Sequence, residues 1–291
     1  MVTPVNEALP HASAERAASV SKPSPGAAVP EVESERRTLW SIPIDAVRME
    51  NALERIECWI DDQRRDCKMV VTPNVDHVVQ LHLNPGLFDI YRRASLTLAD
   101  GWPIVTLSRL FGDRLPERVA GSDLVPKLCE RADAASRPLK LFLLGGDQGV
   151  PEAAAATLES RFPAVQVVGT CSPPFGFQTE TEWNDRICEQ INESEADALV
   201  VGLGFPKQEL WLLEHRWRLH VSTAMAVGAT IDFLAGRQNR APSWMRRFKL
   251  EWLHRLLSDP RRLASRYASD AIQFPLLCLM YSIKRLSARS S

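Results

Sequence analysis

Short apolar runs alternate with helical segments along most of this chain, and that alternation restricts the fold more than any other feature. Strands are predicted at residues 68–72 (KMVVT), 96–99 (LTLA), 140–144 (KLFLL), 165–169, 198–201 (ALVV) and 223–227. Helices are expected from Pro151, around residues 206–215 and near Ile231. Strands that alternate with helices are typical of parallel βαβ units. The sequence therefore predicts an α/β fold with a doubly wound, mostly parallel, Rossmann-like sheet.

The charges are distributed unevenly. The formal net charge is −1, yet residues 236–291 hold 12 lysines and arginines against 3 acidic residues, which leaves a net −10 on the remainder. A basic end of this kind is expected to meet an anionic partner, and the acidic body argues against nucleic acid. We expect a disordered N-terminal extension over residues 1–36, rich in Ala, Pro, Ser and Glu. After this extension we expect an α/β domain over residues 37–236 and then a basic, helical C-terminal appendage over residues 237–291.

Composition also excludes several classes of protein. No window reaches the roughly 18 consecutive apolar residues that span a bilayer, because the best candidate, 272–283, is interrupted by Gln273 and Pro275. The N-terminus lacks the basic start and apolar core of a secretory signal. The 6 cysteines are scattered without a CxxC pair, which is typical of reduced thiols. We therefore expect a cytoplasmic protein.

Polar residues follow the first two predicted strands, at the edge where parallel α/β sheets bind ligands. Asp100 could act as a general base, because partial burial there raises the pKa of a carboxyl, or it could cap the helix that follows Pro103. Thr72 and Asn74 could bind the hydroxyls of a sugar, or they could only complete the turn around Pro73. The residue types leave both interpretations open.

Glycines follow two further strands. Gly145 and Gly146 begin a GGDQG segment, whose N–H groups could hold a phosphate at a helix N-terminus, or whose glycines could only permit a tight turn. The spacing matches neither GxGxxG nor the P-loop, which argues against an NAD-dependent oxidoreductase and a P-loop ATPase. After Gly204, Gln208 and Glu209 open a helix at the same edge. Glu209 could only favour the helix dipole there.

Metal ligands are not evident in the sequence. Asp76 and His77 stand near the end of the first strand, but no cluster of His, Cys and Glu at ligand spacing accompanies them, so core or surface roles are favoured. No DxD motif stands in a loop after a strand. Many nucleotide-sugar transferases bind a divalent ion through that motif, so we expect metal-independent chemistry.

The basic end contains an amphipathic segment, SWMRRFKLEWLHRLL, at residues 243–257. Its aromatic and aliphatic residues recur every four positions and predict one apolar stripe, formed by Trp244, Phe248, Trp252 and Leu256. Such a helix could lie in a membrane interface with its arginines on lipid phosphates, or pack on the body or on a neighbouring copy. Asp259 and Pro260 predict the start of a second helix that carries Arg262 and Arg266 on one face.

Taken together, six ordered motifs resemble the WecG/TagA/CpsF glycosyltransferases, glycosyltransferase family 26. The resemblance runs from about Leu39 to Tyr267 and departs from the family at Lys249, where members commonly carry Gly. The motifs are TPNVDH (72–77), ADGWPIV (99–105), ERVAGSDL (117–124), GGDQGV (145–150), GFPKQELW (204–211) and the run from residue 226 to 267.

This resemblance implies an inverting, metal-independent enzyme that moves a sugar from a UDP-sugar to a polyprenyl-diphosphate-linked sugar at the cytoplasmic face of the membrane. Members build teichoic-acid linkage units, enterobacterial common antigen and exopolysaccharide repeats. The family assignment makes Asp100 the general base, with Thr72 and Asn74 beside it and Arg118 acting on phosphates. Positions that match the nucleotide-sugar pocket are Gln208 and Asp232, and positions that match diphosphate-binding arginines of the appendage are Arg255, Arg262 and Arg266.

Two other functions remain open on the sequence alone. The first is a peripheral scaffold that binds a nucleotide and has no transferase activity. The second is an NAD-dependent oxidoreductase, because Gly-rich βα turns also suit NAD. The donor sugar is open as well, since UDP-glucose, UDP-N-acetylmannosamine and its uronate differ by only a few pocket contacts.

Overall fold

The computed structural model describes residues 35–238, 241–248 and 250–289, without the side chains of residues 243, 246, 262, 288 and 289. Residues 1–34, which make up nearly all of the predicted N-terminal extension, lie outside the described residues. The described chain begins with an antiparallel hairpin of β1 (Arg36–Leu39) and β2 (Ile42–Asp45), which the sequence analysis did not predict. The hairpin is fastened to the main sheet by Asp45, whose Oδ2 accepts the backbone N–H of Thr97 at 2.8 Å.

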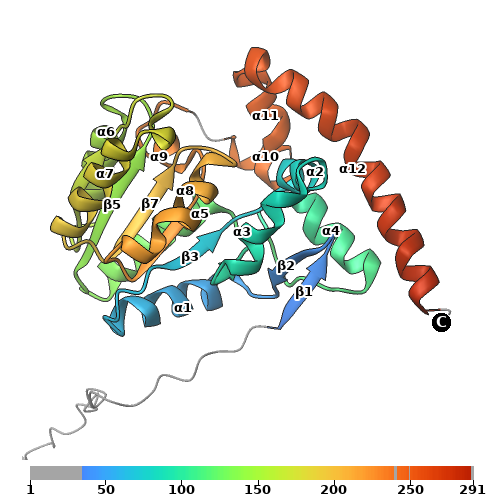
Figure 1. The fold of residues 1–291 in the computed structure, drawn as a ribbon, viewed down its shortest axis with the longest axis horizontal. Helices are drawn as coiled ribbons and strands as arrows, with labels where there is room; N and C mark the ends of the chain where they lie inside the picture. Colours follow the sequence, from blue (N-terminus) through green and yellow to red (C-terminus); the bar gives the residue numbers. More distant parts are fainter. Residues whose placement is uncertain (1–34, 239–240, 249, 290–291) are drawn as a thin grey trace, which may run out of the picture. The chain divides into compact units, whose positions relative to one another are not determined.

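The main sheet has six strands in the order β4-β3-β8-β7-β5-β6, and every neighbouring pair is parallel (Figure 1). The strands are β3 (Lys68–Val71), β4 (Leu96–Thr97), β5 (Leu139–Gly145), β6 (Val165–Cys171), β7 (Ala198–Gly202) and β8 (Thr223–Ala226). Each corresponds to a run expected from the sequence. The predicted α/β fold with a parallel sheet is therefore confirmed.

Helices cover both faces of this sheet, because side chains of successive strand residues point to opposite faces. In β3, Met69 and Val71 pack into one core cluster and Val70 into the other. The cluster with Val70 receives α1 (Met49–Asp61), α5 (Gly121–Ala134), α6 (Val150–Arg161) and α9 (Thr230–Leu234). The opposite cluster receives α2 (Val75–Leu83), α3 (Phe88–Arg93), α4 (Trp102–Phe111), α7 (Thr181–Glu193) and α8 (Lys207–His215). Three short 3-10 helices, η1 (Pro85–Leu87), η2 (Phe177–Thr179) and η3 (Arg216–Arg218), lie in the connections.

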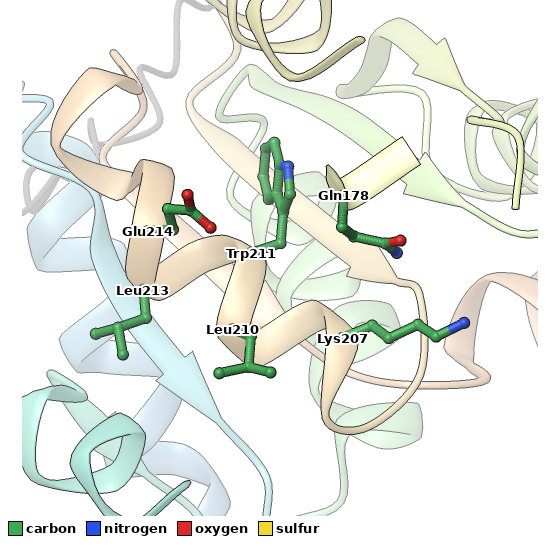
Figure 2. Close-up of a pocket in the computed structure, with 6 residues that line it drawn as sticks. All are labelled: Gln178, Lys207, Leu210, Trp211, Leu213 and Glu214. Atoms are coloured by element: carbon green, nitrogen blue, oxygen red, sulfur yellow. The ribbon is translucent and has the colours of Figure 1, made fainter. Parts of the chain in front are cut away.

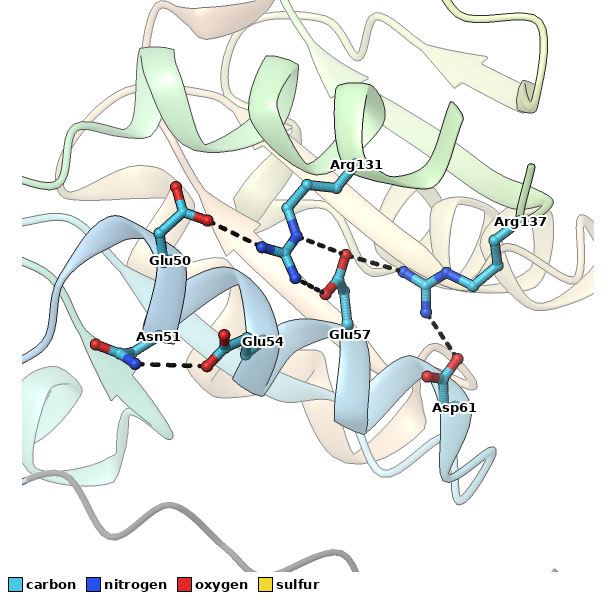
Figure 3. Close-up of polar contacts among 7 residues, drawn as sticks. All are labelled: Glu50, Asn51, Glu54, Glu57, Asp61, Arg131 and Arg137. Carbon is cyan, nitrogen blue, oxygen red and sulfur yellow. Dashed lines mark hydrogen bonds and ion pairs between the residues drawn. The ribbon is translucent and has the colours of Figure 1, made fainter. Parts of the chain in front are cut away.

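Helices α1 and α5 are also joined by a network of ion pairs (Figure 3). Arg131 of α5 contacts Glu57 at 2.7 Å and Glu50 at 2.9 Å, while Arg137 contacts Asp61 at 2.7 Å. Exposed pairs of this kind contribute at most about 1 kcal/mol each. They link α1 to the C-terminal part of α5, and the first turn of α5 carries Asp123, a carboxylate of the site described below.

The basic appendage folds as three helices, α10 (Ser243–Arg247), α11 (Glu251–Ser258) and α12 (Pro260–Arg289). The predicted second helix does start at Pro260, but the single stripe of residues 243–257 is wrong. The backbone N–H of Leu250 donates to the carbonyl of Met245 at 2.8 Å, and this closure separates α10 from α11. Trp244 and Trp252 therefore lie on different helices, 57% and 50% exposed.

An aromatic cluster anchors α12 on the body. Trp40 of the hairpin lies 5.4 Å from Phe274, and Phe111 of α4 lies 5.0 Å from Tyr281, measured between ring centroids. The Tyr281 hydroxyl donates to the carbonyl of Thr38 at 2.8 Å. Arg285 forms an ion pair with Asp113 near the far end of the helix. Within the described ranges, no helix is both long enough and apolar enough to cross a bilayer.

Candidate active site

The loops that follow β3, β4 and β8 are tied together at the carboxyl edge of the sheet. The backbone N–H of Asp100 donates to the carbonyl of Pro73 at 2.9 Å. Thr72, only 5% exposed, donates its hydroxyl to the carbonyl of Ala226 at 3.1 Å. This bond gives Thr72 a structural role across β3 and β8, while its predicted part in catalysis stays a prediction.

Asn74 caps helix α2. Its side-chain oxygen accepts the N–H of His77 at 3.3 Å, and its own N–H donates to Nδ1 of His77 at 3.2 Å, which is a reciprocal capping box. His77 is buried against Phe205, with ring centroids 4.1 Å apart, and burial lowers its pKa to about 3. The imidazole is therefore neutral at physiological pH, and the core role expected for His77 is confirmed.

Asp100 does not cap the following helix. The N-cap of α4 is Gly101, and no side chain caps that helix. The Asp100 side chain is 19% exposed and contacts Nη1 of Arg118 at 3.4 Å. Burial raises the pKa of Asp100, while the positive charges of Arg118 and Arg255 oppose that rise. A carboxyl group whose pKa is raised by desolvation is better suited to accept a proton than an exposed one.

Arg118 stands at the centre of a carboxylate cluster. Besides Asp100, its guanidinium contacts Asp123 of α5 at 3.1 Å and Glu251 of α11 at 2.7 Å. The sequence analysis did not predict Asp123 or Glu251 as site residues, although Asp123 lies in the motif ERVAGSDL and Glu251 in the run from residue 226 to 267. Because Glu251 belongs to the appendage, the site combines side chains from the body and the appendage.

Gln208 joins the loops after β7 and β8. It is 2% exposed, and its Oε1 accepts the N–H groups of Gly204 and Gly228, both at 3.2 Å. Its Nε2 donates to Oε1 of Glu209 at 2.8 Å. Glu209 is fully buried, and that burial raises its pKa to about 7. Glu209 lies in the first turn of α8, where its charge would favour the helix dipole, and it also accepts a hydrogen bond from the buried side chain of Gln208.

The glycines at the end of β5 are explained by close packing of strand ends. Gly145 has φ +115°, and a Cβ there would lie 2.6 Å from the carbonyl oxygen of Gly202 in β7. Gly146 also has a positive φ, +81°, which favours glycine. The tight-turn interpretation therefore accounts for both positions, and their contact with a phosphate stays a prediction.

The appendage arginines reach different places. Arg255 lies over the ring of Phe233 at 5.3 Å and acts electrostatically on Asp100. Arg266 instead contacts Asp76 of α2 at 2.6 Å. The side chain of Arg262 and the residue Lys249 lie outside the described residues. Asp232 lies in the first turn of α9, where its carbonyl accepts the N–H of Arg237 at 3.0 Å.

The described side chains that could bind a metal ion are His, Cys, Asp and Glu. Across the described ranges, no group of three or more His, Cys, Asp and Glu side chains is arranged to hold a metal ion. In the cluster around Asp100, the guanidinium of Arg118 is the cation that the carboxylates share. The expected metal independence remains a prediction.

The parallel sheet and the carboxylate–arginine cluster at its edge define a doubly wound α/β protein with a charged site at the carboxyl ends of its strands. Residues 37–288 match the model of the glycosyl transferase WecG/TagA/CpsF family, and the chain belongs to that family. A relative from Staphylococcus aureus, N-acetylglucosaminyldiphosphoundecaprenol N-acetyl-β-D-mannosaminyltransferase, is 28% identical over 222 residues, which are 76% of this chain and 84% of the relative. A protein of the same name from Bacillus spizizenii is 30% identical over 193 residues, 66% of this chain and 72% of the relative.

Proposed function

We propose that this protein transfers a sugar from a UDP-sugar to a sugar carried on polyprenyl diphosphate, with inversion at the anomeric carbon. Two relatives are named for transfer of N-acetylmannosamine to N-acetylglucosaminyldiphosphoundecaprenol. These names make UDP-N-acetylmannosamine the first donor to test and a lipid-linked N-acetylglucosamine the first acceptor. The observation that carries the proposal is the partly buried carboxylate of Asp100 beside Arg118, at the ligand-binding edge of the sheet.

The reaction needs one base and one stabilised leaving group. Asp100 accepts the proton of the acceptor hydroxyl as that oxygen attacks the anomeric carbon from the face opposite to UDP. The bond from the anomeric carbon to the β-phosphate oxygen breaks, and its electron pair leaves with UDP. Burial raises the pKa of Asp100, which makes its carboxylate a stronger base than an exposed one.

Arginines in place of a metal would stabilise the departing diphosphate. Arg118 already contacts three carboxylates, so in this proposal it orients Asp100. Arg255 is an appendage arginine whose charge acts on Asp100, so in this proposal it stabilises the charge that develops on the departing diphosphate. Arg262 and Arg266 are proposed to complete the diphosphate contacts, Arg266 with guanidinium N–H groups other than the one that contacts Asp76.

Helix α12 supports a peripheral position on the cytoplasmic face of the membrane. Its inner side packs on the aromatic cluster, while its outer side exposes an apolar row at alternating spacings of four and three residues. The row consists of Ile272, Leu276, Leu279, Ile283 and Leu286, each between 56% and 73% exposed. Together with the basic charge of residues 236–291, such a row suits the interface of an anionic bilayer.

Calorimetric titration with UDP in EDTA tests the nucleotide assignment, with NAD as the control ligand. Saturable binding of UDP without metal, and none of NAD, is the expected result. Binding of NAD alone would replace this proposal with an oxidoreductase. Metal-dependent binding of UDP would contradict the arginine-based account of the leaving group.

A further inference from the structure

A second polar pocket lies beside the candidate active site, between α2, the loop after β7 and α12. Its volume is about 500 Å³, within the range of about 300–1,000 Å³ that small-molecule sites occupy. Asp76, Gln80 and Asn84 line it from α2 and its C-terminus, and Arg266 lines it from α12. Of these lining residues, only Arg266 has a part in the proposed transfer reaction.

The buried groups of this pocket lack some of their hydrogen bonds. Asp76 is 5% exposed; its Oδ2 is bound by Arg266, but its Oδ1 has no hydrogen-bond partner. The Nε of Arg266 also has no partner. Buried polar atoms are nearly always satisfied in proteins, so an acceptor and a donor left open together indicate a missing ligand. A hydroxyl group supplies both a donor and an acceptor and therefore matches the pair.

The rest of the lining has the composition of a sugar site. Gln80 and Asn84 offer amide groups for hydroxyl and acetamido substituents. Leu87, Phe205 and Pro206 form an apolar wall against which the C–H face of a sugar ring can pack. Phe205 is supported from behind by the buried ring of His77, at 4.1 Å between centroids. A few polar groups facing an apolar wall favour an uncharged, hydroxyl-rich ligand.

The position of the pocket distinguishes acceptor from donor. Asn74 is the N-cap of helix α2, and a Cβ at Gly101, the residue after Asp100, would lie 3.9 Å from the Cα of Asn74. The pocket is therefore lined by the helix whose first turn, with Asp76, follows the loop bonded to the backbone of Asp100. Its other wall is α12, the helix whose outer row is exposed. An acceptor sugar held here would have its diphosphate and lipid along the appendage, to which α12 belongs.

We propose that this pocket is the subsite for the acceptor sugar, an N-acetylated hexose whose ring lies against Phe205 and whose hydroxyl bridges Asp76 and Arg266. The inference rests on the proposed transferase function. It assigns Gln80 and Asn84 as residues that set acceptor affinity without touching the UDP donor.

The test uses Gln80→Ala and Asn84→Ala, neither of which removes a member of the ion pair between Asp76 and Arg266. The Gln80 side chain also hydrogen-bonds Asp76, so Asn84→Ala is the variant that leaves Asp76 unperturbed. The matched control is Gln178→Ala, which lies in a different pocket beside α8, with Lys207 and Trp211 (Figure 2). The probe is N-acetylglucosaminyl diphosphate on a short alkyl chain. Its binding is measured by calorimetry without donor, and its KM is measured in the transfer reaction.

Loss of one neutral hydrogen bond predicts that each pocket variant weakens binding of the probe and raises its KM roughly 3- to 10-fold. The affinity for UDP should stay unchanged, and the control variant should match the wild type in every measurement. Probe affinity within about twofold of the wild type in both pocket variants would overturn the proposal. Probe binding that is lost in these variants would support the pocket even if no donor gave transfer, so failure of the proposed function remains distinguishable.

Discussion

Replacement of Asp100 by Asn tests the general base with little change in shape. The amide keeps the size of the carboxyl but cannot accept the proton of the acceptor hydroxyl at neutral pH. General-base catalysis contributes about 10²- to 10⁴-fold, so kcat should fall by that factor, equivalent to about 3 to 5 kcal/mol of transition-state free energy. The affinity for UDP should remain close to that of the wild type.

The contacts around Arg118 explain why this variant should stay folded. Arg118 keeps its bonds to Glu251 at 2.7 Å and Asp123 at 3.1 Å, and the contact that weakens is the longest of the three, at 3.4 Å. Because burial outweighs the attraction of the nearby arginines and raises the pKa of Asp100, folding does not favour its charged form, and an uncharged amide should leave the melting temperature close to that of the wild type. A normal melting curve with low kcat therefore separates catalysis from stability.

The pH profile provides an independent readout of the same residue. Asp100 acts as a base only when ionised, so kcat/KM should fall as the pH decreases through its pKa. Because burial raises that pKa above the ordinary 3.8, the fall should occur at a higher pH than for an exposed aspartate. A variant with near-wild-type kcat, or one that keeps the acid limb of the wild type, would refute Asp100 as the base.

Three further predictions concern the appendage. Burial raises the pKa of Asp270 to about 6, so ionisation of this carboxyl opposes folding. Asp270→Asn should therefore be more stable than the wild type at neutral pH, by on the order of 1 kcal/mol. The difference in melting temperature between the two proteins should vanish as the pH falls towards about 4, where Asp270 becomes protonated in the unfolded state as well as in the folded state. Tyr281→Ala removes a ring from the aromatic anchor and should make α12 more sensitive to trypsin than the exposed-site control Ile283→Ala; equal cleavage rates would contradict the anchoring role. The double variant Leu279→Glu and Ile283→Glu should sediment less with vesicles that contain phosphatidylglycerol, whereas Trp217→Glu, which alters a 78% exposed residue outside the appendage, should bind them as the wild type does.

The strands of the main sheet could be predicted because each is a short apolar run with both faces buried. Even β4, with two paired residues, was visible in LTLA. The hairpin of β1 and β2 could not be predicted, since RRTL and IPID mix polar and apolar residues and are stabilised by tertiary contacts of Trp40 and Asp45. The break between α10 and α11 was missed because a spacing of four residues continues through it in the sequence.

The site was predictable only where a residue follows a strand. Asp100 and Gln208 were found by that rule, and the structure places both at the carboxyl edge of the sheet. The partnership of Arg118 with Glu251 could not be found, because 133 residues separate them and no local pattern encodes the pairing. The same holds for Arg266 and Asp76, which join α12 to α2.

The most direct test of the central claim is a transfer reaction followed by mass spectrometry. The full-length protein is incubated in EDTA with UDP-N-acetylmannosamine and N-acetylglucosaminyl diphosphate on a short alkyl chain, with Asp100→Asn in parallel. The account predicts that the wild type adds one N-acetylhexosamine to the lipid-linked acceptor and releases UDP, while the variant forms product at least about 100-fold more slowly. Absence of product with this donor, UDP-glucose and the uronate, from a protein that binds UDP, would contradict the claim that the site is a glycosyltransferase centre.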